Sequence, residues 1–214
     1  KHILDRLISN CRNLIWIDHH DSSLELCENH SEYNNIAGIR SKDGSGAWLT
    51  YKYLFVDPGY DADIPNYIEL VSDYDTWSLY DNCKYFKLGI DSVPNDVFDE
   101  IWKKLDDEYY QSRDCDCIFN LIQTGKRIKS YIDMDNKNYL KSYGYPSTTP
   151  DGLYSVYVVN KKTNSWIFGN KINEYDACVV FAFDGNNYSY SIYSSEESSF
   201  DCQRFAEVYG GGGH

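Results

Sequence analysis

The sequence predicts an α/β protein made of a parallel-sheet lobe, a helical linker and a smaller mixed α/β lobe. Three observations support this fold class. Residues 1–90 alternate helix-like and strand-like segments, residues 91–145 space their apolar side chains as helices do, and residues 146–214 hold strand-like runs before a last helix. With 214 residues, 42% of them hydrophobic, the chain is long enough to bury a sizeable core.

The first lobe is predicted to open with a helix over residues 2–11 and a strand over residues 13–18, "NLIWID". Nearly continuous apolar runs of this length are typical of strands buried in a parallel sheet. Ser45 is expected to cap a helix that continues to residue 55. Pro65 is expected near the start of another helix, which ends in "SDYDTW".

The linker and the second lobe follow. In the linker, Val97, Ile101 and Leu105 recur at the four-residue spacing of a helix. The break between linker and lobe is placed at residues 144–152, "GYPSTTPDG", because prolines and glycines gather there. Beyond it the pattern predicts a strand over 153–160, a hairpin over 177–195 and a helix over 200–209, with Gly210 in the left-handed C-terminal position.

Composition excludes some classes of protein. Acidic residues outnumber basic ones by 33 to 20, for a net charge of −13, and this argues against broad binding of duplex nucleic acid. A short anionic substrate held by a metal ion is still compatible with that charge. The chain has seven cysteines but no pair of CxxC motifs, and it shows no signal peptide, so we expect reduced thiols in a cytoplasmic protein. No apolar run approaches the ~18 residues of a membrane span, so we expect no membrane contact.

Asp18, His19 and His20 directly follow the predicted core strand. Ligands bind at the carboxyl ends of strands in open parallel sheets, and imidazole and carboxylate groups suit Mn, Fe, Co or Zn. The alternative is a polar surface loop that happens to contain histidines. The triplet alone does not separate these two interpretations.

Two further motifs are candidates for the same site. Asp73 and Asp75 end an apolar segment and could complete a metal site opened by His19, although Ser-Asp and Asp-Thr pairs also form caps and turns. Residues 210–213 are four glycines followed by His214, and such a run lets backbone N–H groups approach an anion closely. The alternative there is a flexible tail or a cloning linker.

Taken together and in order, these segments resemble a known family: "NLIWIDHH", "SGAWLTYKYLF", "VSDYDTW", "FGNKINEYDACVVFAF", "YSYSIYSS" and "FDCQRFAEVYGGGGH". They are similar to the DHH phosphoesterases with a C-terminal DHHA1 domain, above all to the small-oligonucleotide nucleases (nanoRNases) of the RecJ-like group. The resemblance covers nearly the whole chain and is weakest in the middle helices. It implies a DHH lobe, a DHHA1 substrate-binding lobe and a dinuclear site that usually holds Mn²⁺, with Mg²⁺ or Co²⁺ as substitutes.

The resemblance also implies roles for single residues. His19 would be a metal ligand. Asp18 would orient the His19 ring without binding the metal itself, and His20 would face the scissile phosphate. Asp73 fits the acidic ligand position better than Asp75, which stays open as the alternative. The loop Gly211, Gly212, Gly213 and His214 would hold the substrate phosphate or the terminal nucleotide.

This chain departs from the family pattern at three points. An HxDxD-type motif and a further Asp are expected before the triplet and do not occur in this chain, so we expect it to be part of a larger enzyme. Tyr193 stands where the family carries an arginine, and a tyrosine cannot clamp a phosphate bidentately. Asp21 stands where a basic residue is common and makes the mouth of the site more negative.

The function that the resemblance implies is hydrolysis of short single-stranded oligonucleotides or dinucleotides to nucleoside monophosphates, at a cleft between two lobes, by a protein that can form a homodimer. Two alternatives stay open. One is a pyrophosphatase or a cyclic-dinucleotide phosphodiesterase, which share the DHH site. The other is a degenerate, non-catalytic nucleotide-binding module, which the Tyr193 replacement and the absent ligands would suit.

Overall fold

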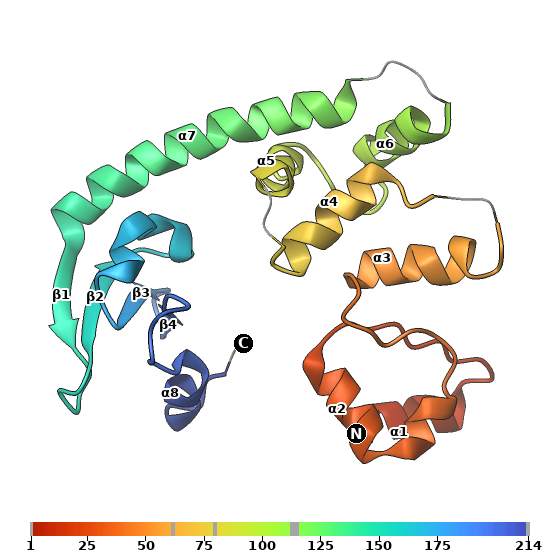
Figure 1. The fold of residues 1–214 in the computed structure, drawn as a ribbon, viewed down its shortest axis with the longest axis horizontal. Coiled ribbons are helices and arrows are strands. Elements are labelled where there is room, and N and C mark those ends of the chain that lie inside the picture. The colour runs from red at the N-terminus through yellow and green to blue at the C-terminus, as the bar shows by residue number, and fades with distance from the viewer. Residues whose placement is uncertain (1, 61–62, 79–80, 112–115, 213–214) are drawn as a thin grey trace. The chain divides into compact units, whose positions relative to one another are not determined.

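The computed structural model describes residues 2–60, 63–78, 81–111 and 116–212. Within these ranges the fold is mixed α/β, with eight α-helices and one four-stranded sheet (Figure 1). The chain divides into two compact units, Lys1–Lys129 and Ser130–His214. The division falls inside a helix, whereas the sequence analysis placed three segments with borders near residues 90 and 145.

Unit 1 is built from helices. Ser45 caps the third of them as expected, because its side chain accepts a hydrogen bond from the Trp48 backbone N–H. Pro65 precedes the fourth helix directly, also as expected. The helices are α1 (His2–Asn10), α2 (Asp21–Asn29), α3 (Gly46–Tyr51) with a π-helical extension (Lys52–Val56), α4 (Asn66–Asp75), α5 (Asp81–Ile90), α6 (Glu100–Gln111) and the first part of α7 (Cys117–Tyr143).

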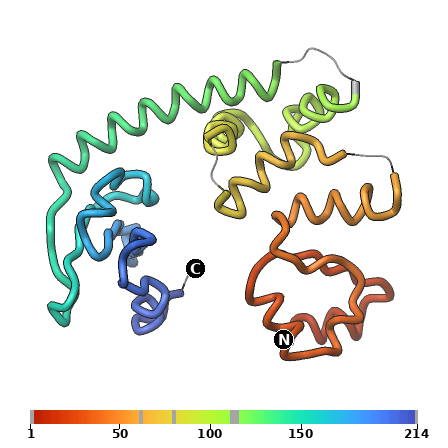
Figure 2. The backbone as a smooth tube through the Cα atoms, viewed as in Figure 1, coloured from red at the N-terminus to blue at the C-terminus, as the bar shows by residue number. Residues whose placement is uncertain are grey.

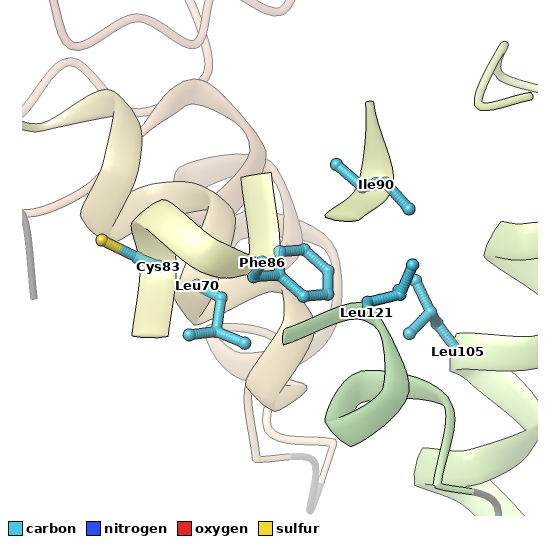
Figure 3. Packing of buried hydrophobic residues seen from close by; sticks show 6 residues of the cluster. All are labelled: Leu70, Cys83, Phe86, Ile90, Leu105 and Leu121. Atoms are coloured by element: carbon cyan, nitrogen blue, oxygen red, sulfur yellow. The ribbon is translucent and has the colours of Figure 1, made fainter. Parts of the chain in front are cut away.

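The core of unit 1 lies among α4, α5, α6 and α7. Its buried side chains, drawn in Figure 3, are Leu70, Cys83, Phe86, Ile90, Leu105 and Leu121. Leu105 belongs to α6 and is fully buried, so the spacing that predicted this helix also identified its buried face. The interpretation of these helices as a linker was wrong for α6 and the start of α7, because their apolar faces complete the core of unit 1. Val97, by contrast, precedes α6 and is 77% exposed.

Two glycines let α5 and α7 approach closely. A Cβ atom added at Gly89 would lie 2.1 Å from the Leu121 carbonyl oxygen, and one added at Gly125 would lie 1.8 Å from the Tyr85 carbonyl oxygen. Both distances are far below van der Waals contact. Glycine therefore serves here as a packing residue inside two helices, in spite of its low helix propensity.

The strand predicted over residues 13–18 is the main correction in unit 1. The segment is extended and pairs in the parallel direction, but only through two isolated bridges, Ile15 with Ala37 and Asp18 with Arg40 (Figure 2). Ile15 is 53% exposed, so the apolar run is not buried. Among the described residues of unit 1 no regular parallel sheet forms, because one short partner segment cannot cover both faces of a strand.

Unit 2 holds the sheet and the last helix. Its strands are ordered β1-β2-β3-β4, with β2 and β3 parallel and the other two pairs antiparallel. The predicted strand, hairpin and last helix of this lobe are confirmed. The elements after α7 are β1 (Gly144–Thr148), β2 (Ser155–Asn160), two 3₁₀ turns (Ser165–Ile167 and Gly169–Asn173), β3 (Ala177–Phe183), β4 (Tyr188–Tyr193) and α8 (Cys202–Val208).

The predicted break over residues 144–152 was wrong in its first half, which forms β1 and pairs with β2. Pro146 is compatible with a strand here because β1 lies at the edge of the sheet. An edge strand has no neighbouring strand on its outer side, so no hydrogen bond is lost there when an N–H is missing. Gly152 takes the positive φ of +73° in the turn that follows. A proline-rich and glycine-rich sequence therefore marks an edge strand and its turn.

The two faces of the sheet are covered by different elements. On one face Tyr157 and Cys178 pack with Leu140 of α7. On the other face Val156 packs with Phe200, and Phe205 of α8 lies against this cluster. Asp201 caps α8 by accepting a hydrogen bond from the Arg204 N–H, and Gly210 takes a φ of +79° after it, as the sequence predicted.

Two predictions from composition bear on the described residues. None of their helices has the length and apolar character to cross a membrane. Four of their cysteines are free thiols: Cys11, Cys27, Cys178 and Cys202. Cys115 lies outside the described residues.

The close approach of α5 and α7 predicts that Gly125→Ala destabilises unit 1. Alanine favours a helix over glycine by about 1 kcal/mol, but forcing a methyl group into the Tyr85 carbonyl requires the helices to separate, at a cost of about 1–3 kcal/mol or more. The net effect is a lower midpoint of urea unfolding, measured by circular dichroism. Asn120→Ala, at an exposed position of the same helix, is the matched control and should not lower it. A Gly125→Ala protein as stable as the wild type would contradict this packing.

Candidate metal centre

Asp18, His19 and His20 lie where an extended segment turns into α2. Asp18 is bridged to Arg40, His20 precedes the helix as its N-cap residue, and α2 begins at Asp21. The ligand atoms of the three side chains lie within 4.8 Å of one another. The triplet is therefore a compact cluster of imidazole and carboxylate groups, fixed by backbone pairing on one side and by a helix on the other.

The Asp18 carboxylate organises the cluster through both of its oxygens. Oδ1 accepts hydrogen bonds from the backbone N–H groups of His19 and His20, at 2.8 and 3.1 Å. Oδ1 also lies 2.8 Å from the His20 Nδ1, and Oδ2 accepts from the Ser23 hydroxyl at 2.5 Å. Burial by itself would raise the pKa of the Asp18 carboxyl, but the hydrogen bonds from Ser23 and His20 hold it well below its usual range.

These contacts change the role expected for Asp18. The sequence analysis expected this carboxylate to orient the His19 ring, whereas the ring that it contacts is that of His20. The reason is local geometry, since His20 and Ser23 belong to the start of the helix that folds back over Asp18. With Nδ1 directed at the carboxylate, His20 presents Nε2 outward from a side chain that is 55% exposed. The hydrogen bond to Asp18 raises the pKa of His20.

His19 lies next to the end of α4. Its Nε2 lies 3.4 Å from Oδ2 of Asp75, and only 19% of its side chain is exposed. A Cβ atom at Gly46, the first residue of α3, would lie 3.9 Å from its Nδ1. The rings of His19 and His20 are neighbours, with centroids 4.3 Å apart and planes tilted by 30°. His19 is thus the inner imidazole of the cluster, next to a carboxylate.

The position of Asp75 bears on the alternative that the sequence left open. Asp75 is the last residue of α4, and its carboxylate meets His19. Asp73 lies two residues earlier, so its side chain leaves the helix about 200° away from that of Asp75. Burial raises the pKa of the Cys83 thiol of α5, and the charge of Asp73 adds to this effect. Asp73 is thus near enough to Cys83 for its charge to act on that thiol, whereas the carboxylate that meets His19 is that of Asp75.

Further contacts that the sequence analysis did not predict hold these elements in place. The Ser45 backbone N–H donates to the Ser72 hydroxyl at 2.9 Å in a buried position, which joins the start of α3 to α4. Arg40 donates to the carbonyl oxygens of Trp16 and Ile36. Ser23 could have been found from its place in the first turn after the triplet, whereas the Ser45–Ser72 contact joins residues too far apart in sequence.

The donor set fits a divalent cation with mixed nitrogen and oxygen ligands. His19 Nε2 and the Asp75 carboxylate converge and can hold such an ion, while the oxygens of Asp18 already accept hydrogen bonds from protein groups. Mn²⁺ is compatible with both ligand types. Two surface hollows of unit 1 lie around Gly38 and Ile39 and do not include the cluster.

The remaining predicted site residues belong to unit 2. Tyr193 pairs with Cys178 and is half-buried on the sheet face covered by α7, opposite to the face that carries α8. Gly211 follows α8 and donates its N–H to the Ala206 carbonyl, while a Cβ atom at Gly212 would meet only open space. Gly213 and His214 lie outside the described residues. Their roles in substrate binding, and the cleft between two lobes, stay predictions.

Comparison with known proteins gave no relative for this chain: no family model, no curated protein and no solved structure matches it. The resemblance to DHH phosphoesterases therefore rests on the sequence motifs alone.

The geometry predicts that Asp75→Asn weakens Mn²⁺ binding and that Asp73→Asn does not. Loss of a carboxylate ligand should lower the affinity at least about tenfold, as changes near metal sites commonly do. His19→Ala should have the same effect or a larger one. Mn²⁺ binding can be followed by the loss of the free-ion signal in electron paramagnetic resonance. Weaker binding in Asp73→Asn with unchanged binding in Asp75→Asn would overturn the assignment.

Proposed function

We propose that this chain carries the histidine cluster of a metal-dependent phosphodiesterase that hydrolyses short oligonucleotides to nucleoside monophosphates. The observation that carries the proposal is the pair of adjacent imidazoles on the Asp18 carboxylate, with Asp75 beside the inner one. An inner imidazole with a carboxylate suits a cation, and an outer exposed imidazole suits a substrate. The order of motifs in the sequence supports the same function.

The proposed division of labour follows from these positions. A divalent cation, when bound, stabilises charge on the phosphoryl oxygens and lowers the pKa of a bound water. His19 and Asp75 hold that cation. Asp18 fixes the backbone of both histidines through its hydrogen bonds from their N–H groups. His20 is held by Nδ1, so its Nε2 is free to contact an oxygen of the scissile phosphate.

The glycine run supports a nucleotide substrate over inorganic pyrophosphate. Backbone N–H groups without flanking side chains can approach a phosphate closely, and the sequence around the run is similar to the substrate-binding DHHA1 lobe of nucleases. Gly212 has open space around it. The net charge of −13 is unfavourable for long duplexes, which bind through many phosphate contacts.

The test is hydrolysis of labelled dinucleotides with Mn²⁺ by the longest natural chain that contains this sequence. We expect turnover to nucleoside monophosphates, abolished in His19→Ala. In His20→Gln we expect kcat to fall about 100-fold or more, the usual effect of losing a donor to an oxygen that gains negative charge in the transition state. The matched control is His30→Gln, because His30 lies at the other end of α2 and contacts Glu32 instead. This control should retain wild-type activity.

Two results would contradict the proposal. Cleavage of pyrophosphate without cleavage of dinucleotides would make the protein a pyrophosphatase. Tight nucleotide binding without turnover, unchanged by metal and by His19→Ala, would make it a binding module.

A further inference from the structure

Four aromatic side chains form a strip on the hairpin of unit 2. Phe181 and Phe183 belong to β3, and Tyr188 and Tyr190 belong to β4. The register pairs Phe181 with Tyr190 and Phe183 with Tyr188. Because directly paired residues, and residues two apart on a strand, share one face of a sheet, all four side chains lie on the same face.

The rings of this aromatic strip are arranged as neighbouring plates. Phe181 and Tyr190 are stacked, with centroids 5.9 Å apart and planes inclined by only 24°. Phe183 and Tyr188 have centroids 4.8 Å apart, and Tyr188 and Tyr190 have centroids 6.4 Å apart. The strip is therefore a continuous group of neighbouring aromatic rings.

Most of this surface is open. Phe183, Tyr188 and Tyr190 are 55%, 59% and 63% exposed. Closer to the end of β4, Ile192 and its partner Val179 lie on the same face and are covered by Phe200 and α8. The aromatic strip starts where that cover ends. Exposed aromatic side chains in such a group, beside an otherwise covered face, are characteristic of a binding surface.

We propose that the aromatic strip binds single-stranded nucleic acid by stacking its bases. The inference deepens the proposed function and rests on it, because it names the part of the protein that would hold a substrate longer than a dinucleotide. Every base has a π-face, and sheets that present aromatic rings bind unpaired bases in this way. The tyrosine hydroxyls keep the surface wettable, whereas a docking site for a protein core would favour aliphatic side chains.

The strip itself is uncharged. The six residues of β4, "YSYSIY", carry no charge, so phosphates beside it meet no carboxylate on that strand. Lys162 is exposed and acts electrostatically on Asp184, the residue after Phe183, so a cation and a carboxylate lie near each other at one end of the strip. With a net charge of −13 on the chain, stacking has to provide most of the affinity. We therefore expect weak salt dependence.

The strip also lies on the sheet face that α8 covers. α8 packs on that face through Phe205 and leads directly to Gly210 and Gly211. A substrate whose terminal phosphate contacts the glycine run can thus extend its further bases along one face of unit 2. Bases beyond the second nucleotide are the ones that the strip would hold.

The experiment measures binding of fluorescein-labelled hexathymidylate to the full chain in EDTA, by fluorescence anisotropy. Tyr188→Leu with Tyr190→Leu should weaken binding about tenfold or more, because stacking contributes about 1–3 kcal/mol per base while leucine keeps apolar area without a π-face. Tyr131→Leu, at an exposed position of α7, is the matched control and should bind as the wild type does. Circular dichroism confirms that each variant is folded. The slope of log K against log salt concentration should stay near the ~−0.7 of a single phosphate contact.

Three outcomes would contradict the proposed role of the strip. These are no binding of hexathymidylate by the wild type, equal binding by the double leucine variant, or a wild-type dimer that becomes a monomer in the double variant. The last result would mean that a second copy covers β4. A separate arm measures dinucleotide hydrolysis with Mn²⁺, which the double variant should leave unchanged. Loss of hydrolysis in the wild type with intact binding in EDTA would refute the proposed function and leave the strip standing.

Discussion

The candidate site depends on one partly buried constraint, the hydrogen bonding of the Asp18 carboxylate. It accepts two backbone N–H groups, one imidazole and one hydroxyl, all within the six residues from Asp18 to Ser23. These bonds join the end of an extended segment to the start of α2 and fix the backbone of both histidines and the ring of His20. An aspartate is suited to this position because a short acceptor with two oxygens can serve backbone and side chains at once.

Around this constraint the two imidazoles acquire different environments. His19 is largely buried against the start of α3 and the end of α4, whereas His20 is exposed. The Ser45–Ser72 hydrogen bond fixes α3 against α4, and with it the carboxylate of Asp75 near His19. A division between a metal-holding and a substrate-facing histidine is the simplest chemical use of this asymmetry. In unit 2 the open aromatic strip offers what a metal cluster lacks, a surface for bases.

Local signals in the sequence were sufficient for much of the fold. The Ser45 cap, the helix start at Pro65, the hairpin around the turn at residues 184–187 and the left-handed Gly210 depend on neighbours within a few residues, and each was confirmed. Features set by distant neighbours were missed. The apolar run before Asp18 has the pattern of a buried strand, although its partner segment covers little of it. The need for glycine at position 125 is evident only from the packing of α5 against it. The choice between Asp73 and Asp75 likewise depends on how α4 faces His19, which no motif spacing contains.

The most direct test of the account is whether a divalent cation goes to the histidine cluster. Substoichiometric Mn²⁺ broadens the proton signals of nearby rings in nuclear magnetic resonance spectra. The structure predicts that the ring signals of His19 and His20 broaden first. His30 lies at the far end of α2, about 15 Å along the helix axis, and should stay sharp. Broadening of His30 together with the others, or sharp signals for His19 and His20 at these Mn²⁺ concentrations, would contradict the account.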